Sequence, residues 1–296
     1  IYFIVIVCFI GIRIISSLVK VSTAVSVCLN IIIQVGLMFL VPLFMYKLLR
    51  KKKVGEVFKE FNVKKINFKA ILLAILIGFI VYFLNLAVAS FFNIFIYATG
   101  YDPSFGMSSA SSSGYPVAQF LLDVLLTAIL PGICEEFCHR GMLVNGYKQL
   151  DVKKTIFLVG FLFGLMHLNI EQFFYATVIG MFLTYLVYAT GSIIPSMIIH
   201  FMNNFMGLYL TFAMYNNLPL GNFSKNLANA LNASNAVVAF IAIVFGVVIV
   251  LGLLALLVRA LMRQTRVKQF ENLAQKAINK KQREDLFQDF NLDANK

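Results

Sequence analysis

The chain has 296 residues, of which 60% are hydrophobic and only 13% are charged, and its mean hydropathy is +0.85. Soluble globular domains are much more polar, so the composition excludes that class and predicts a protein with several membrane spans. The net charge of +12 does not indicate a nucleic-acid partner, because the basic residues lie beside apolar segments, where they set membrane topology. The alternating ten-residue pattern of a membrane β-barrel is missing from the sequence, so we expect an all-α protein.

Eight apolar segments follow one another along the chain, and we interpret each as a transmembrane helix. They form one expected transmembrane domain, residues 1–262, followed by a basic cytoplasmic tail, residues 263–296. The expected spans are Ile1–Val19, Thr23–Leu49, Ala70–Tyr97, Val117–Tyr147, Thr155–Leu168, Phe173–Ala189, Ile193–Tyr215 and Ala236–Leu261.

The loops between these spans differ in charge. Lys47–Lys69 is densely basic, whereas the serine-rich loop Gly100–Pro116 has no Lys or Arg and the polar loop Asn216–Asn235 has a single Lys. Cytoplasmic loops are enriched in Lys and Arg, so we place the basic loops and both termini in the cytoplasm. The apolar, Lys- and Asn-rich composition with a short core favours a bacterial plasma membrane. The basic loop also contains an amphipathic pattern, which predicts a short helix on an anionic membrane surface. Its apolar residues are Val54, Val57, Phe58 and Phe61.

One stretch inside the fourth span, Leu130–Gly141, contains two carboxylates, an imidazole and a guanidinium. Ionisable groups at membrane depth are unfavourable and mark functional sites. At a rise of about 1.5 Å per residue, Glu135, His167 and His200 fall at a similar depth, although their spans run in different directions. We therefore expect an intramembrane polar cavity where these three side chains meet.

Helical spacing assigns partners within each span. Residues four apart share a helix face, so Glu136 and Arg140 are expected to form a structural ion pair. Glu135 points about 100° away from Glu136, which leaves its carboxylate free for chemistry. The same spacing joins two further pairs, Phe163 with His167 and His200 with Asn204.

Two chemistries fit these side chains. A carboxylate in an apolar environment can act as a general base, so Glu135 with His167 would hold and deprotonate a water, while His200 and Asn204 stabilise an oxyanion. This set suits hydrolysis of a peptide bond and requires no cofactor. The alternative uses Glu135, His167 and His200 as zinc ligands around a metal-bound water. Asn is a poor zinc ligand and no His-Glu-x-x-His motif occurs, so we rank zinc second.

The cysteines give a weaker signal. Cys8, Cys28, Cys134 and Cys138 all lie inside apolar segments, which is typical of buried free thiols. Cys134 and Cys138 are four residues apart, so a metal-binding pair is the less favoured alternative.

These residues resemble the three motifs of the CPBP family of intramembrane proteases, also called the Abi family, which includes CAAX proteases and bacteriocin-processing enzymes. Glu-Glu-x-x-x-Arg is Glu135–Arg140, Phe-x-x-x-His is Phe163–His167, and His-x-x-x-Asn is His200–Asn204, in the family's order within a motif core of residues 117–209. The resemblance implies about eight transmembrane helices and a cavity open to the cytoplasm. It also implies that Glu135 and His167 activate water and that His200 and Asn204 form the oxyanion site.

The resemblance implies a membrane-associated peptide or protein as substrate, within membrane lipid. Similar proteins cleave prenylated CAAX tails, or in bacteria serve peptide maturation, bacteriocin immunity and control of membrane partners. Some are non-proteolytic, so the alternative is a membrane scaffold that binds and regulates a cell-envelope enzyme or sensor. One position departs from the family pattern: the residue before Arg140 is commonly apolar but here is His139, four residues after Glu135 and within reach of a hydrogen bond to it.

Overall fold

The computed structural model describes residues 1–18, 22–101, 114–233, 238, 241 and 244–265, and all regular structure in these ranges is helical. The expected all-α class is therefore confirmed for the described residues. Residues 102–113, which hold the serine run, and residues 266–296, which make up most of the expected tail, lie outside the described residues.

Six helices in the described ranges are long and apolar enough to cross a membrane: Thr23–Leu49, Phe68–Ala98, Val117–Gly146, Ile170–Thr190, Ile194–Tyr215 and Val244–Thr265. The first and fifth expected spans are shorter helices. In α1 (Tyr2–Leu18) the apolar part is Tyr2–Ser16, and α9 (Val152–Met166) has 15 residues. A helix of that length rises about 22 Å, less than the roughly 30 Å of a hydrocarbon core. The structure thus supports an integral membrane protein but does not confirm the count of eight spans.

Several of these helices are continuous runs of shorter elements. Thr23–Leu49 consists of α2 (Thr23–Ile31), the π-helix η1 (Ile32–Leu40) and α3 (Val41–Leu49). Val117–Gly146 consists of α6 (Val117–Asp123), the π-helix η2 (Val124–Ile129), α7 (Leu130–Glu136), the π-helix η3 (Phe137–Leu143) and α8 (Val144–Gly146). The other elements are α4 (Val54–Glu60), α5 (Phe68–Ala98), α10 (Ile170–Thr190), α11 (Ile194–Tyr215) and α12 (Pro219–Ala233).

Short polar side chains explain where several of these helices begin. The oxygens of Ser22, Asn67, Asp151 and Asn169 each accept a hydrogen bond from a backbone N–H in the first turn of α2, α5, α9 and α10, respectively. These bonds satisfy donors that have no partner inside the helix. Most of the polar loop expected at Asn216–Asn235 is instead α12, which begins at Pro219, a residue well suited to a first helical turn.

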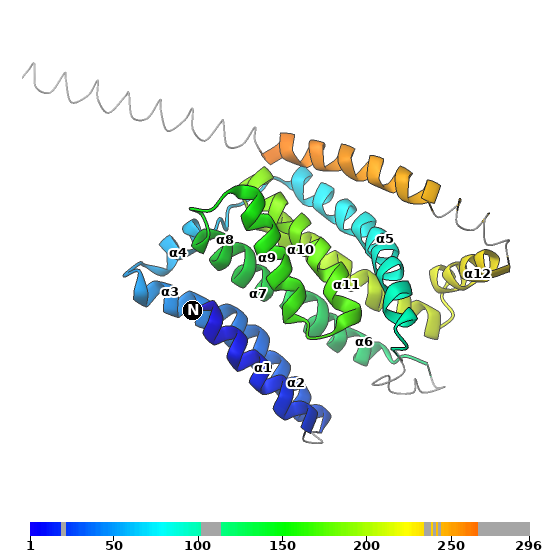
Figure 1. Cartoon of the computed structure of the whole chain (residues 1–296), viewed down its shortest axis with the longest axis horizontal. Coiled ribbons are helices and arrows are strands. Elements are labelled where there is room, and N and C mark those ends of the chain that lie inside the picture. The colour runs from blue at the N-terminus through cyan, green and yellow to red at the C-terminus, as the bar shows by residue number, and fades with distance from the viewer. Residues whose placement is uncertain (19–21, 102–113, 234–237, 239–240, 242–243, 266–296) are drawn as a thin grey trace, which may run out of the picture.

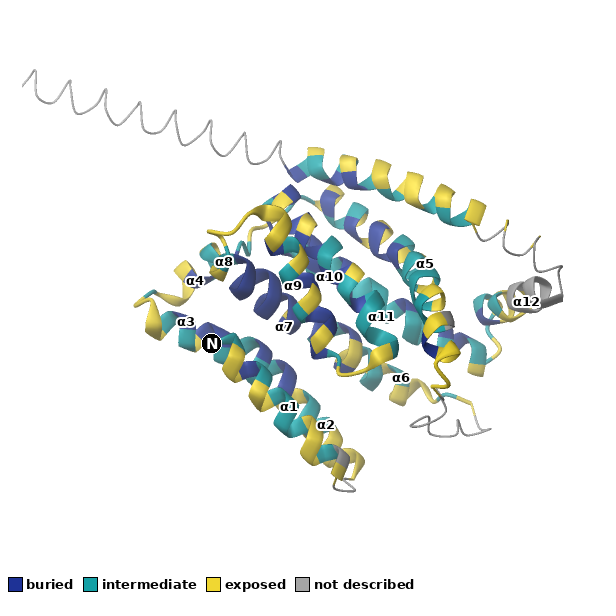
Figure 2. Cartoon of the chain, viewed as in Figure 1, coloured by how far each residue is buried: buried dark blue, intermediate teal, exposed yellow. Residues whose placement is uncertain are grey.

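The helices form a bundle around α10 and α11. Figure 1 shows α5 along one side of these two helices, while α1 and α2 lie together at the opposite side. Helix α10 packs closely on α9, and α11 packs closely on α5. In Figure 2 the buried residues concentrate on α7, the adjoining η3 and the central helices, whereas α1 and Val244–Thr265 are mostly intermediate or exposed. The exposed side chains of these outer helices are mostly apolar, as expected for surfaces that face lipid.

Helix α4 confirms that the basic loop contains a short helix, and part of its apolar face packs on protein. Val57 and Phe61 are fully buried, whereas Val54 is exposed. The ring of Phe61 lies 5.0 Å from that of Phe137 and 4.8 Å from that of Tyr46, measured between centroids. Half of the apolar residues that the sequence assigned to the membrane surface are therefore buried inside the bundle.

Two glycines let α9 and α10 approach closely enough to place Phe163 and His167 in the bundle interior. A Cβ atom on Gly160 would lie 2.6 Å from the backbone nitrogen of Met181. A Cβ atom on Gly164 would fall on the side chain of Thr177 and lie 2.6 Å from the Phe173 carbonyl oxygen. Small residues spaced four apart allow this kind of helix contact in membranes.

We expect Gly164→Ala to destabilise the protein by about 1–3 kcal/mol, because the added methyl group must push α9 away from α10. Thermal unfolding in a mild detergent would measure the loss. Gly246→Ala is the matched control, since nothing lies within 4 Å of its added Cβ in helix Val244–Thr265. Equal stability of the two variants would show that the close contact between α9 and α10 does not require glycine at position 164.

A polar cluster fastens α4 to the end of α3. Tyr46 donates a hydrogen bond to Oε2 of Glu60 (2.7 Å), Lys52 forms an ion pair with Oε1 of Glu60 (2.9 Å), and Asn145 donates to the Tyr46 hydroxyl (2.6 Å). The hydrogen bond from Tyr46 and the contact with Lys52 hold the pKa of Glu60 below its ordinary value. The cluster therefore favours the ionised carboxylate.

This lowered pKa predicts a pH-dependent contribution of Glu60 to stability. A carboxyl group whose pKa is lower in the folded state stabilises the fold above its unfolded pKa of about 4.3, and this contribution disappears as the pH falls through the lower folded value. The melting-temperature difference between the native chain and Glu60→Gln should be constant from pH 7 to about pH 5 and should shrink below about pH 4. Lys59→Gln, at an exposed neighbouring position, should show no such trend.

Candidate active site

The helix that carries the glutamate pair is interrupted by π-helical turns on both sides. The segments η2 and η3 flank α7, and π-helical turns in α-helices occur frequently at functional sites. Pro131 has no backbone N–H, so it cannot donate to the carbonyl of Thr127, four residues earlier. Asn204 on α11 donates from Nδ2 to that carbonyl at 3.0 Å. The junction between η2 and α7 thus fixes the amide of a predicted oxyanion residue.

The ion pair expected from helical spacing is present. Arg140 Nη1 donates to Glu136 Oε1 at 2.8 Å, and both side chains are fully buried. Nη2 of the same guanidinium donates to the carbonyl oxygen of Gly180 on α10 at 3.0 Å. The Phe163 ring lies 4.3 Å from the guanidinium carbon, a cation–π contact. Arg140 therefore joins three helices at the centre of the bundle.

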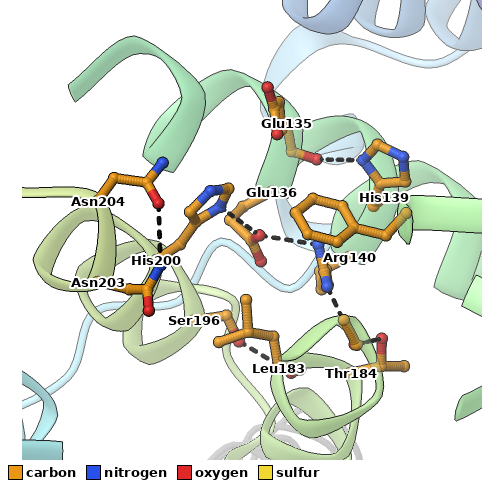
Figure 3. Close-up of polar contacts among 12 residues, drawn as sticks. Glu135, Glu136, His139, Arg140, Leu183, Thr184, Ser196, His200, Asn203 and Asn204 are labelled. Carbon is orange, nitrogen blue, oxygen red and sulfur yellow. Dashed lines mark hydrogen bonds and ion pairs between the residues drawn. The ribbon is translucent and has the colours of Figure 1, made fainter. Parts of the chain in front are cut away.

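Glu136 has a second partner that the sequence did not reveal. His200 Nδ1 lies 2.9 Å from Oε1 of Glu136, the same oxygen that accepts from Arg140 (Figure 3). The carboxylate is an acceptor, so Nδ1 of His200 carries the hydrogen. The other ring nitrogen, Nε2, is then left for chemistry. Glu136 orients a histidine as well as neutralising an arginine.

His167 is oriented by the end of its own helix. Its backbone N–H bonds to the carbonyl of Gly164, three residues back, at 3.1 Å. The carbonyl of Phe163 is thereby free to accept from His167 Nδ1, at 2.8 Å. As in His200, this bond assigns the hydrogen to Nδ1 and leaves Nε2 as the ring nitrogen without a partner in the described structure.

His139 does reach Glu135, but through the main chain. Its Nδ1 lies 2.8 Å from the backbone carbonyl oxygen of Glu135, and its Nε2 lies 3.1 Å from the hydroxyl of Tyr2 on α1. The carboxylate of Glu135 is therefore not occupied by this histidine. Because the carbonyl accepts from Nδ1, a neutral His139 accepts at Nε2 from the Tyr2 hydroxyl.

Phe163 contacts all three imidazoles. Its ring centroid lies 5.0 Å from that of His167, 5.2 Å from that of His139 and 5.5 Å from that of His200, each with edge-on geometry. The apolar wall predicted for His167 thus extends to the whole histidine cluster.

Glu135 points away from Glu136, as the spacing predicts (Figure 3). Its Oε1 accepts a hydrogen bond from Gln34 Nε2 on η1 at 2.8 Å, and only 8% of the residue is exposed. No motif contains Gln34, so the sequence did not single it out. The available signal was an amide side chain inside an apolar span, because polar residues at membrane depth tend to be functional, but Asn30 in the same span gives the same signal.

A cavity of about 490 Å³ opens between α5, α10 and α11. Three of the four predicted catalytic residues, His167, His200 and Asn204, line this cavity. Glu135 is not among the lining residues, although it is close enough to His167 for their charges to interact. Thr127, Phe163 and Asn203 also line the cavity.

The described residues contain no assembled cluster of metal ligands. Among the described residues, no group of three or more His, Cys, Asp or Glu side chains is arranged to hold a metal ion. The zinc alternative with Glu135, His167 and His200 therefore has no assembled ligand set. Cys134 and Cys138 are free and buried in a hydrophobic cluster, which favours the interpretation as apolar thiols. Cys8 and Cys28 are also free but are exposed on the outer helices α1 and α2, so the expectation of burial was wrong for these two.

The fold and the site together define a class: a polytopic helical membrane protein with a buried cluster of carboxylates, histidines and an arginine beside an intramembrane cavity. Residues 117–206 match the model of the Type II CAAX prenyl endopeptidase Rce1-like family. The resemblance to CAAX-type proteases inferred from the three motifs is thereby confirmed for this segment. No curated protein and no solved structure matches the chain.

Proposed function

We propose that this protein is an intramembrane endopeptidase that hydrolyses a peptide bond of a membrane-associated peptide or protein. The single observation that carries the proposal is the shared cavity. His167 from the end of α9 and His200 and Asn204 from α11 line one cavity within a bundle of apolar helices. The segment that carries them matches a family of endopeptidases.

In the proposed mechanism, a water between Glu135 and His167 attacks the carbonyl carbon of the substrate as Glu135 accepts its proton. The tetrahedral oxyanion is stabilised by His200 and Asn204. The proton then passes to the leaving nitrogen and the C–N bond breaks, so atoms and charge balance without a cofactor. Glu135 does not itself line the cavity, so in this proposal the water carries its action to the substrate carbonyl.

The hydrogen bonds of the site refine the role of His200 in this proposal. With Nδ1 bonded to Glu136, the ring donates from Nε2 only as an imidazolium. The Glu136 carboxylate at 2.9 Å stabilises that positive charge. Asn204 uses one amide hydrogen on the Thr127 carbonyl, and its Oδ1 accepts from Asn203 at 3.0 Å, so its second hydrogen is left for the oxyanion.

The proposal also assigns the protein a location. It is an integral protein of a bacterial plasma membrane with both termini in the cytoplasm, supported by its apolar helices and by the basic residues of Lys47–Lys69. Its partners are membrane lipid and the peptide or protein substrate.

The test is an assay of peptide hydrolysis by the purified protein in lipid nanodiscs. A prenylated peptide ending in a CAAX sequence and its unprenylated counterpart would be incubated with and without a chelator, and the products identified by mass spectrometry. We expect cleavage that the chelator does not reduce. Loss of cleavage on chelation would favour the zinc alternative, and no cleavage of any membrane-anchored peptide would contradict the proposal.

One observation favours a second candidate, a non-proteolytic scaffold that regulates a cell-envelope protein. The Glu135 carboxylate is engaged by Gln34 and does not line the cavity. A scaffold would retain its cellular function when Glu135, His167 and His200 are all replaced, and a partner would co-purify with that variant. A protease would lose its cellular function on the same replacement.

A further inference from the structure

Gln34 is the one side chain of the described residues that is hydrogen-bonded to the Glu135 carboxylate. It lies on η1, a helix 101 residues away in sequence, and is only 7% exposed. The orientation of its amide is fixed by chemistry, because a carboxylate oxygen accepts and only the NH₂ group of Gln can donate. Nε2 therefore faces Glu135 Oε1, and the amide oxygen of Gln34 makes no part of this hydrogen bond.

That amide oxygen is buried and has no hydrogen-bond partner among the described residues. A buried acceptor without a donor is unfavourable by about 1–3 kcal/mol and is rare in native proteins. The second carboxylate oxygen of Glu135, Oε2, is not one of these buried orphans, and the hydrogen bond from Gln34 goes to Oε1. The amide oxygen of Gln34 therefore needs a hydrogen donor that the described residues do not supply, and a bound water would supply it.

We propose that Gln34 is a positioning residue for hydrolysis. Its amide N–H fixes the Glu135 carboxylate through Oε1, which leaves Oε2 to accept one hydrogen of the attacking water. The other hydrogen of that water is left for Nε2 of His167, which has no partner in the described structure. This inference rests on the proposed function, because it assigns a role to Gln34 through Glu135.

The inference makes a specific kinetic prediction. Gln34→Met keeps the length and apolar stem of the side chain but removes both the donor and the acceptor. We expect kcat to fall about 10- to 100-fold, since the nucleophile and its base lose their alignment. KM should change less than about twofold, because Gln34 does not line the substrate cavity. Steady-state hydrolysis of a membrane-anchored peptide would separate the two constants.

The matched control lies one turn earlier on the same helix. Asn30 also carries a buried amide oxygen without a partner among the described residues, but it makes no contact with Glu135. Asn30→Leu should leave kcat and KM unchanged. If kcat fell as much in Asn30→Leu as in Gln34→Met, the fall would reflect the packing of this helix in general. That result would overturn the inference.

A double variant tests whether Gln34 acts through Glu135. If it does, Gln34→Met should cause no further loss in a Glu135→Gln background, because residues that act as a unit are not additive. A further tenfold loss in the double variant would overturn the inference. If Gln34→Met does not fold, Gln34→Glu, which has the same size but cannot donate when ionised, should lose kcat to at least the same extent.

The two proposals fail in different ways. If Glu135→Gln is inactive while Gln34→Met retains full kcat, only the role of Gln34 is wrong. If Glu135→Gln is as active as the native chain, the glutamate-dependent mechanism itself is wrong.

Discussion

Glu135→Gln should lower kcat/KM for peptide hydrolysis by about 100- to 10,000-fold, the range expected when a general base is removed. The variant should fold normally, because glutamine has nearly the same shape and its amide oxygen can accept the hydrogen bond from Gln34. The loss would therefore lie in kcat, with little change in substrate binding. Mass-spectrometric quantification of the cleaved peptide, alongside binding of the uncleaved peptide to the variant, would separate the two effects.

Glu171→Gln is the matched control for this substitution. Glu171 lies in the first turn of α10 and accepts a hydrogen bond from Tyr97 at 3.0 Å, on an exposed part of the molecule. Its replacement makes the same chemical change away from the cavity and should leave hydrolysis unchanged. Comparable activity of Glu135→Gln and Glu171→Gln would reject Glu135 as the base.

Arg140→Met should destabilise the protein by about 3–5 kcal/mol, the cost of leaving one partner of a buried ion pair uncompensated. Glu136 is fully buried, and without Arg140 it would have only His200 as a hydrogen-bond donor. The Gly180 carbonyl would lose one of its donors, although Thr184 Oγ1 would still donate to it at 2.8 Å. Thermal or denaturant-induced unfolding of the two proteins in detergent would measure the loss of stability.

The double variant Glu136→Gln with Arg140→Met separates charge from packing. Because no charge is then left unpaired, it should be more stable than Arg140→Met alone. Arg140→Lys should be intermediate, since an ammonium group keeps the charge but cannot reproduce the forked contact with Glu136 and Gly180. If the double variant were no more stable than the single one, the buried charge would not be the cause.

The sequence predicted the features that depend on helical geometry within one span. The Glu136–Arg140 pair, the separate direction of Glu135 and the shared cavity of His167 and His200 all follow from residue spacing and rise per residue. The number of spans could not be predicted in this way, because α1 and α9 are apolar but short for a bilayer.

Contacts between helices could not be derived in the same way. The bond between His200 and Glu136 joins residues 64 apart, and the bond between Gln34 and Glu135 joins residues 101 apart. Spacing shows which side chains share a face of one helix, but the partner across an interface depends on crossing angles and rotamers. Tyr2 on α1 was missed for the same reason, although its hydroxyl meets His139.

The position of Phe163 has a consequence for how mutational data on this protein should be interpreted. One aromatic ring is in contact with three imidazoles and a guanidinium, so a change at any of these positions alters the surroundings of the others. Energies measured by replacing each histidine alone will consequently not sum to the total for the group. Assigning a separate share of the rate enhancement to each ring would require complete thermodynamic cycles that include the phenyl group between them.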